Sequence, residues 1–161
     1  MSNKWVVNAS PLILLAKVGY IHLLPKLTEQ LVIPSSVVAE VQAGPPMDPA
    51  QSWLSGEGAT WIRPDIATVS SVAAWDLGAG ETAVLSWAHE HGDFEAILDD
   101  RAARKCAVIE RIPVRGTLGV ILAAKVRGLI PSAKLVCGDI VQAGLRVHPT
   151  ILRDALKLVG E

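Results

Sequence analysis

Short apolar runs alternate along the chain with segments whose apolar residues recur every three or four positions. The runs predict strands, at residues 5–8, 31–34, 59–62, 96–98 and 113–114. The periodic segments predict helices, at residues 11–18, 35–43, 51–54, 82–91, 101–109, 117–128, 132–143 and 149–159. Strands that alternate with helices are typical of a mostly parallel sheet covered on both faces. We therefore expect a three-layer α/β/α fold with extra helices at the C-terminal end.

Length and composition agree with one domain. The chain has 161 residues, half of them hydrophobic, which is enough to form one full core. We expect a single domain over residues 1–161, with its core at about 4–130 and a helical extension at about 131–161. Because 15 Lys and Arg nearly balance 16 Asp and Glu in charge, any binding of nucleic acid would depend on a local basic patch.

The sequence also indicates a compartment. Mean hydropathy is positive, at +0.37, but no run approaches the ~20 apolar residues of a membrane-spanning helix. The early apolar residues Trp5-Val6-Val7 lack the pattern of a secretion signal. Cys106 and Cys137 stand alone among small apolar residues, which disfavours both a disulfide framework and a zinc site. We therefore expect a cytoplasmic protein with reduced, buried thiols and no contact with a membrane.

The apolar run 96–98 ends abruptly at two carboxylates, Asp99 and Asp100, and a helical segment begins at Arg101. In open α/β sheets, ligands bind beyond the carboxyl ends of the strands, so this turn is a candidate site. The alternative is that one of the two aspartates caps the helix by accepting a backbone N–H.

Other oxygen-bearing side chains are expected at the same edge of the sheet. Asn8 follows the first strand, Glu81 lies in the first turn of a helix, and Glu40 lies on a mostly apolar helix. Converging carboxylates repel one another, and Mg²⁺ or Mn²⁺ relieves that repulsion. Such a site suits phosphodiester hydrolysis. For Glu40, an exposed edge of the helix is an equal alternative, and the position of Ser10 before Pro11 is explained by helix capping.

Several motifs in a fixed order carry a resemblance to a known family. They are V-V-N-A-S-P-L-I-L-L-A-K, I-P-S-S-V-V-A-E, L-G-A-G-E-T-A-V-L-S-W-A, A-I-L-D-D-R-A-A-R and G-T-L-G-V-I-L-A-A-K-V-R-G-L-I. Together they span nearly the whole chain and resemble the PIN-domain superfamily. The similarity is greatest to an uncharacterised prokaryotic branch of nucleic-acid-binding proteins, related to toxin–antitoxin ribonucleases.

The resemblance implies a metal-dependent ribonuclease that uses Mg²⁺ or Mn²⁺. It implies a site built from Asn8, Glu40, Glu81 and Asp99, with Asp100 as an additional acidic neighbour. The family's usual first aspartate is Asn8 in this chain. An amide oxygen can touch a hard cation but brings no negative charge, so the affinity for Mg²⁺ should fall.

Basic residues next to the acidic turn are candidates for binding RNA. Arg101, Arg104 and Lys105 share the helix that begins there, and the alternative is that they are surface charges paired with carboxylates. Ser10 and Thr117 are further nucleic-acid candidates, and Thr117 is also expected to cap its helix. A basic rim could be completed by Arg115, Lys125 and Arg127.

Two main hypotheses remain open. The first is a metal-dependent endoribonuclease with Asp99, Glu81 and Glu40 as catalytic metal ligands and a water molecule as the nucleophile. By resemblance it would be the toxin of a toxin–antitoxin pair, with a small antitoxin as partner, and a homodimer. The second is a catalytically impaired module that binds nucleic acid or protein. A phospho-acceptor receiver domain is disfavoured, because its acidic residues gather where this chain has Asn8.

Overall fold

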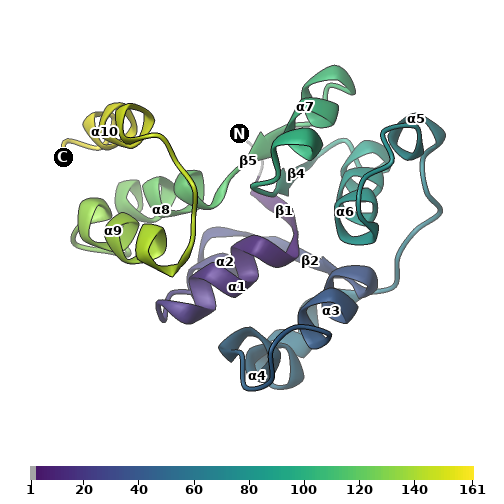
Figure 1. Ribbon diagram of the computed structural model, residues 1–161, viewed down its shortest axis with the longest axis horizontal. Coiled ribbons are helices and arrows are strands. Elements are labelled where there is room, and N and C mark those ends of the chain that lie inside the picture. Colours follow the sequence, from purple (N-terminus) through teal and green to yellow (C-terminus); the bar gives the residue numbers. More distant parts are fainter. Residues whose placement is uncertain (1–2) are drawn as a thin grey trace.

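The computed structural model describes residues 3–161, so residues 1 and 2 of the expected domain lie outside the described part. A five-stranded sheet with the order β3-β2-β1-β4-β5 forms its centre (Figure 1). The strands are β1 (Lys4–Val7), β2 (Gln30–Pro34), β3 (Ile62–Arg63), β4 (Phe94–Ile97) and β5 (Val114–Arg115). Every strand pair is parallel, as the alternation of strands and helices predicts.

Helices cover both faces of the sheet and give the three-layer α/β/α fold. On one face, α6 packs against β1, β2 and β4 and also contacts α3, α5 and α7. On the other face, α2 packs on β2, and α8 packs on β5, α1 and α9. The helices are α1 (Ala9–Lys17), α2 (Leu23–Leu27), α3 (Ser35–Gln42), α4 (Pro49–Ser55), α5 (Ser70–Ala73), α6 (Ala79–Glu90), α7 (Arg101–Ile109), α8 (Thr117–Val126), α9 (Ala133–Ala143) and α10 (Pro149–Lys157).

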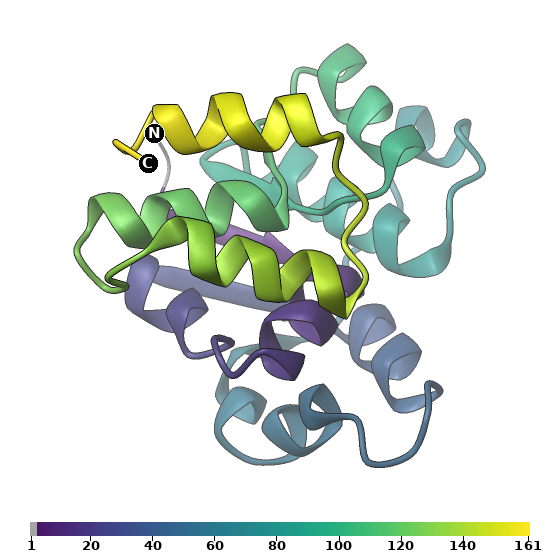
Figure 2. The same ribbon diagram turned by 60° about the vertical axis from the view of Figure 1, so that its left-hand side comes forward.

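The C-terminal helices lie along one flank of the molecule. Figures 1 and 2 both show α8 between α9 and α10, with α10 on the outside. Helix α10 is mostly exposed and buries Leu156. The Glu161 side chain beyond it accepts hydrogen bonds from the Ser132 hydroxyl and from the N–H groups of Ala133 and Lys134 at the start of α9. These contacts tie the residue that follows α10 to the start of α9.

The order of the strands determines where a site can form. After β1 the chain adds strands on one side, and β4 then returns to pair with β1 on the other side. Such a reversal leaves a crevice beyond the carboxyl ends of the two central strands. Asn8 and Asp99 follow these strands, and the Asn8 N–H donates to the Ile97 carbonyl at 2.9 Å. Both residues line one cavity at this edge of the sheet, as expected.

The apolar runs form the buried core. Val6, Ile33 and Ile97 of the central strands are fully buried, and so is Leu85 of α6. Both cysteines are buried free thiols, as expected. Among residues 3–161, no helix is long and apolar enough to cross a membrane.

Residues 57–62 correct one predicted strand. The sequence predicts a strand over 59–62, but Glu57–Trp61 forms a 3₁₀ helix, η1, and only the pair Ile62–Arg63 is extended. The Trp61 ring stacks on the Trp53 ring with centroids 5.6 Å apart, and Gly58 packs so closely on Trp53 that a side chain would not fit there. This packing bends the chain, so the aromatic contact outweighs the strand propensity.

Two predicted helix caps are also wrong. Helix α1 begins at Ala9, two residues earlier than expected, and Asn8 occupies its N-cap position. Helix α8 follows Gly116 at its N-cap, so Thr117 is already its first residue. Neither Ser10 nor Thr117 bonds the start of its own helix, because both hydroxyls donate to Asp99.

Candidate functional site

The polar side chain at the end of β1 lies at the centre of the candidate site. Asn8 is 2% exposed, and its Nδ2 donates a hydrogen bond to Glu81 Oε1 at 3.3 Å. Its Oδ1 atom is buried and accepts no hydrogen bond from the described residues. Leaving such an acceptor unsatisfied costs about 1–3 kcal/mol, so this atom points to a ligand.

A cavity of about 420 Å³ lies at the strand ends beside this amide. Asn8, Ser10, Glu81, Asp99 and Asp100 all line it. The structure therefore brings together five residues that the sequence analysis singles out. They come from β1, β4 and the starts of α1 and α6, which meet at the point where the strand order reverses.

Glu40 reaches the same site from α3. Its carboxylate and the Asn8 amide both face Gly80, since a Cβ atom at residue 80 would lie 2.5 Å from Glu40 Oε2 and 3.0 Å from Asn8 Oδ1. Loss of hydration, together with the nearby charge of Glu81, raises the pKa of Glu40 above its ordinary value. Glu40 is exposed, as its exposed-edge alternative predicts, and does not line the cavity, but its carboxylate approaches the Asn8 amide beside Gly80.

Asp99 is held in one orientation by hydrogen bonds to both of its oxygens. The Thr117 N–H donates to Oδ1 at 2.8 Å, and the hydroxyls of Thr117 and Ser10 donate to Oδ2 at 2.6 and 3.1 Å. Thr117 is fully buried, so it positions Asp99 and cannot make the nucleic-acid contact predicted for it. Ser10 remains partly exposed on the cavity wall.

Asp100 takes the capping role that was one of its two predicted roles. Its Oδ2 accepts the Ala103 N–H at 2.9 Å, which places Asp100 at the N-cap of α7. The neighbouring carboxylate of Asp99 thus remains available to the cavity. The two aspartates have separate tasks, because one satisfies the helix start and the other faces the crevice.

The donor atoms of the site fit a hard divalent cation. Within residues 3–161, no three Asp, Glu, His or Cys side chains gather closely enough to hold a metal ion by themselves. The donor set is instead mixed: the Glu40 and Glu81 carboxylates repel each other beside the unpaired amide oxygen of Asn8. A cation held by these three residues would relieve the repulsion and satisfy the amide.

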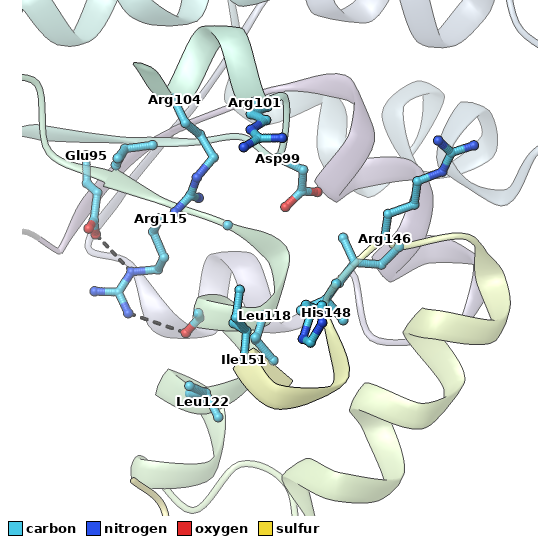
Figure 3. A pocket seen from close by; sticks show the side chains of 15 residues that line it. Glu95, Asp99, Arg101, Arg104, Arg115, Leu118, Leu122, Arg146, His148 and Ile151 are labelled. Atoms are coloured by element: carbon cyan, nitrogen blue, oxygen red, sulfur yellow. Dashed lines mark hydrogen bonds and ion pairs between the residues drawn. The ribbon is translucent and has the colours of Figure 1, made fainter. Parts of the chain in front are cut away.

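Two of the predicted basic residues flank a second, larger cavity. This cavity measures about 980 Å³, and Arg101, Arg104 and Asp99 are among its lining residues (Figure 3). Arg104 Nη1 donates to the Leu98 carbonyl at 3.3 Å, which holds its side chain against the end of β4. Lys105 is exposed on α7 and lines neither cavity.

Of the expected basic rim, Arg115 lines the larger cavity, whereas Lys125 and Arg127 line neither cavity. Arg115 donates to Glu95 Oε1 at 3.0 Å and lies 5.5 Å from the centre of the Trp5 ring. Lys125 is 3.5 Å from Glu161 in an ion pair. Both cations are therefore neutralised by carboxylates of the fold itself. Arg127 is exposed at the end of α8, away from both cavities.

The nitrogen-bearing side chains that sequence reasoning missed are those of Arg146 and His148. Both line the larger cavity from the segment between α9 and α10, and Arg146 also lines the smaller acidic cavity. The only signal in the sequence is the basic pair in Arg-Val-His directly before Pro149. Their proximity to Asp99 depends on how α10 packs, which no local pattern reveals.

The comparisons with known proteins agree with the fold and with the order of the motifs. No curated protein and no solved structure matches the chain. A protein-family model described as a PIN domain matches residues 4–161, which is nearly the whole chain. The chain therefore belongs to the PIN-domain family.

Proposed function

We propose that the protein is a Mg²⁺- or Mn²⁺-dependent endoribonuclease. The observation that carries the proposal is the buried Oδ1 of Asn8, which lacks a hydrogen-bond donor between two mutually repelling carboxylates. Glu40, Glu81 and Asp99 would be the catalytic acidic residues, with Asn8 as the neutral member of the set. Family membership supports a nuclease-like fold for this site.

The residues of the site have different roles. Glu81 and Asn8 are already linked by a hydrogen bond of 3.3 Å, and both residues line the smaller cavity. Asp99 is fixed by Thr117 and cannot turn away when a substrate phosphate approaches. When bound, a divalent cation supplies Lewis-acid polarisation of the phosphoryl group.

Cleavage of a mixed RNA pool tests this proposal. The assay compares Mn²⁺ with EDTA for the wild type and for Asp99→Asn, with Asp139→Asn as the matched control on the exposed side of α9. We expect cleavage with Mn²⁺ by the wild type and by the control only. Cleavage that continues with EDTA or in Asp99→Asn would overturn the proposal, because it would not come from this site.

A second candidate is a PIN-like module that binds nucleic acid or protein and has lost catalysis. The observation in its favour is that the Asn8 amide donates to Glu81 and so partly compensates one carboxylate without any cation. RNA binding without Mn²⁺-dependent cleavage would support this candidate.

From the resemblance, we further propose a toxin role in the cytoplasm, with a small antitoxin as partner and a homodimer as the assembly. Exposed apolar side chains on α7, Val108 and Ile109, offer surface for such contacts. Sedimentation equilibrium tests the dimer, and a monomer at all concentrations would exclude it. Growth arrest on expression tests the toxin role, and normal growth with an active enzyme would contradict it.

A further inference from the structure

The larger cavity shares a wall with the acidic site. Asp99, Leu145 and Arg146 line both cavities, so an extended polymer could lie across both of them on the protein surface. In Figure 3, Arg101 and Arg104 lie on one side of Asp99 and Arg146 lies on the other. A ligand of the larger cavity would therefore lie next to the residue that is most firmly positioned in the site.

The charges around the larger cavity are suited to an anion. Neither Arg101 nor Arg146 forms a side-chain hydrogen bond or ion pair within residues 3–161. His148 Nδ1 accepts the Thr150 N–H at 3.1 Å, so in the neutral ring the proton is on Nε2, which can donate. Two unpaired guanidinium groups and an imidazole donor are the groups that bind phosphate in proteins.

Glu95, Asp99, Arg104 and Arg115 also line this cavity, and a separate part of its lining is apolar, which narrows the class of anion. Leu118 and Leu122 of α8 and Ile151 of α10 lie together on one side of the cavity (Figure 3). Ile151 is 59% exposed and lines the cavity together with Leu118 and Leu122, so these side chains form one apolar surface. An ion such as free phosphate would use the arginines and leave this surface in water. A nucleotide would use both, because its base has an apolar face.

We propose that this cavity binds one nucleotide of a single-stranded nucleic acid, with Arg101 and Arg146 on the phosphates at its two ends, one on each side of Asp99, and the Leu118–Ile151 surface under its base. The strand must be single, because the bases of a duplex are stacked and their faces are hidden. The C-terminal helices thus supply one wall of a substrate-binding surface. The proposal rests on the proposed function for its choice of a nucleic acid over other polyanions.

Binding without metal tests the proposal separately from catalysis. The probe is a labelled single-stranded oligonucleotide of about eight residues, measured by fluorescence anisotropy in EDTA. Arg146→Ala and Arg101→Ala are compared with Arg153→Ala, an exposed arginine of α10 that lines neither cavity. We expect each cavity variant to bind about three- to tenfold more weakly and to lower the salt slope by about 0.7, with the control unchanged.

The apolar surface needs its own variant. Ile151→Ser should weaken binding of the normal oligonucleotide, but not of an abasic oligonucleotide with the same number of phosphates. Since Ile151, Arg101 and Arg146 are exposed, these variants should keep the wild-type melting temperature. RNA and DNA strands are both tested, and preference for either over duplex supports the proposal.

Three results would overturn it. They are equal affinity for duplex, equal affinity for polyglutamate of matched charge, and an unchanged salt slope in Arg146→Ala. If the oligonucleotide binds as expected but no cleavage occurs with Mn²⁺, the proposed function fails and the binding site stands. If cleavage occurs but the cavity variants bind like the wild type, the binding site fails and the nuclease stands.

Discussion

Changing Asn8 to Asp tests how the neutral residue at the end of β1 governs the site. In the wild type, Asn8 Nδ2 donates to Glu81 Oε1 at 3.3 Å. Asn8→Asp replaces this hydrogen bond by two facing carboxylates. Two unit charges at this distance repel by about 5 kcal/mol at an effective dielectric constant of about 20. Without a cation, the variant should therefore be clearly less stable.

Proton uptake limits this cost. One carboxyl can protonate instead, and at pH 7 this costs about 4 kcal/mol for an ordinary pKa near 4. We expect Asn8→Asp to lower the free energy of unfolding by about 2–4 kcal/mol at pH 7 in EDTA. The urea midpoint should fall by about 1–2 M. Lowering the pH towards 5 should return part of the loss, because the shared proton then binds more easily.

A divalent cation should reverse the effect. It binds the ionised pair, so the relieved repulsion appears as tighter binding of Mn²⁺, by one to three orders of magnitude. Titration calorimetry measures the affinity, and urea unfolding with and without Mn²⁺ measures the stability. Asn3→Asp, the same change at an exposed residue, is the control. Equal Mn²⁺ affinity in Asn8→Asp and the wild type would refute the assignment of Asn8 to the metal.

Three further outcomes follow from single contacts. Gly80→Ala should weaken Mn²⁺ binding and destabilise the fold by about 1–3 kcal/mol, whereas Gly138→Ala, at an open helical position, should stabilise it by about 0.5–1 kcal/mol in urea unfolding. Thr117→Val should cost about 1–2 kcal/mol and slow RNA cleavage, and full activity would show that the hydroxyl on Asp99 has no role. Hydrogen bonds, with that of Ser132 first, lower the pKa of Glu161 to about 2. The stabilisation by Glu161 is thus present above pH 4.5 and is lost as the pH falls through about 2, so the difference in melting temperature between the wild type and Glu161→Gln should shrink over that range.

The sequence predicts the elements well because most of them depend on local patterns. The periodic segments 101–109 and 133–143 are helices with nearly the predicted bounds, and the run before Asp99 is a central strand. Asp99 and Glu81 could be identified as site candidates because a strand end and a first helical turn are local features. The parallel sheet then brings them into one cavity.

The errors arise where a distant partner decides the conformation. Ser10 and Thr117 have the residue types and positions of helix caps, yet both donate to Asp99, which is 89 and 18 residues away. Arg115 and Lys125 look like free surface cations, but carboxylates of the fold neutralise them. Local patterns carry no information on such partners.

An acidic region and a basic region of the molecule meet at Asp99. Glu40 and Glu81 form the acidic region, where loss of hydration and then the charge of Glu81 raise the pKa of Glu40, and such a surface alone would repel a phosphate. Arg101 and Arg146, unpaired within the described residues, lie beside the same aspartate and attract one. A phosphodiester chain held by the arginines would therefore approach the acidic site along a favourable field, and a cation bound at Asn8 would remove the remaining repulsion. The hydrogen bonds from Thr117 keep Asp99 on the boundary between the two regions. Substitutions in the basic region should therefore weaken binding of the phosphodiester chain and leave the structure of the acidic region unchanged. Substitutions in the acidic region should weaken cation binding and leave the structure of the basic region unchanged.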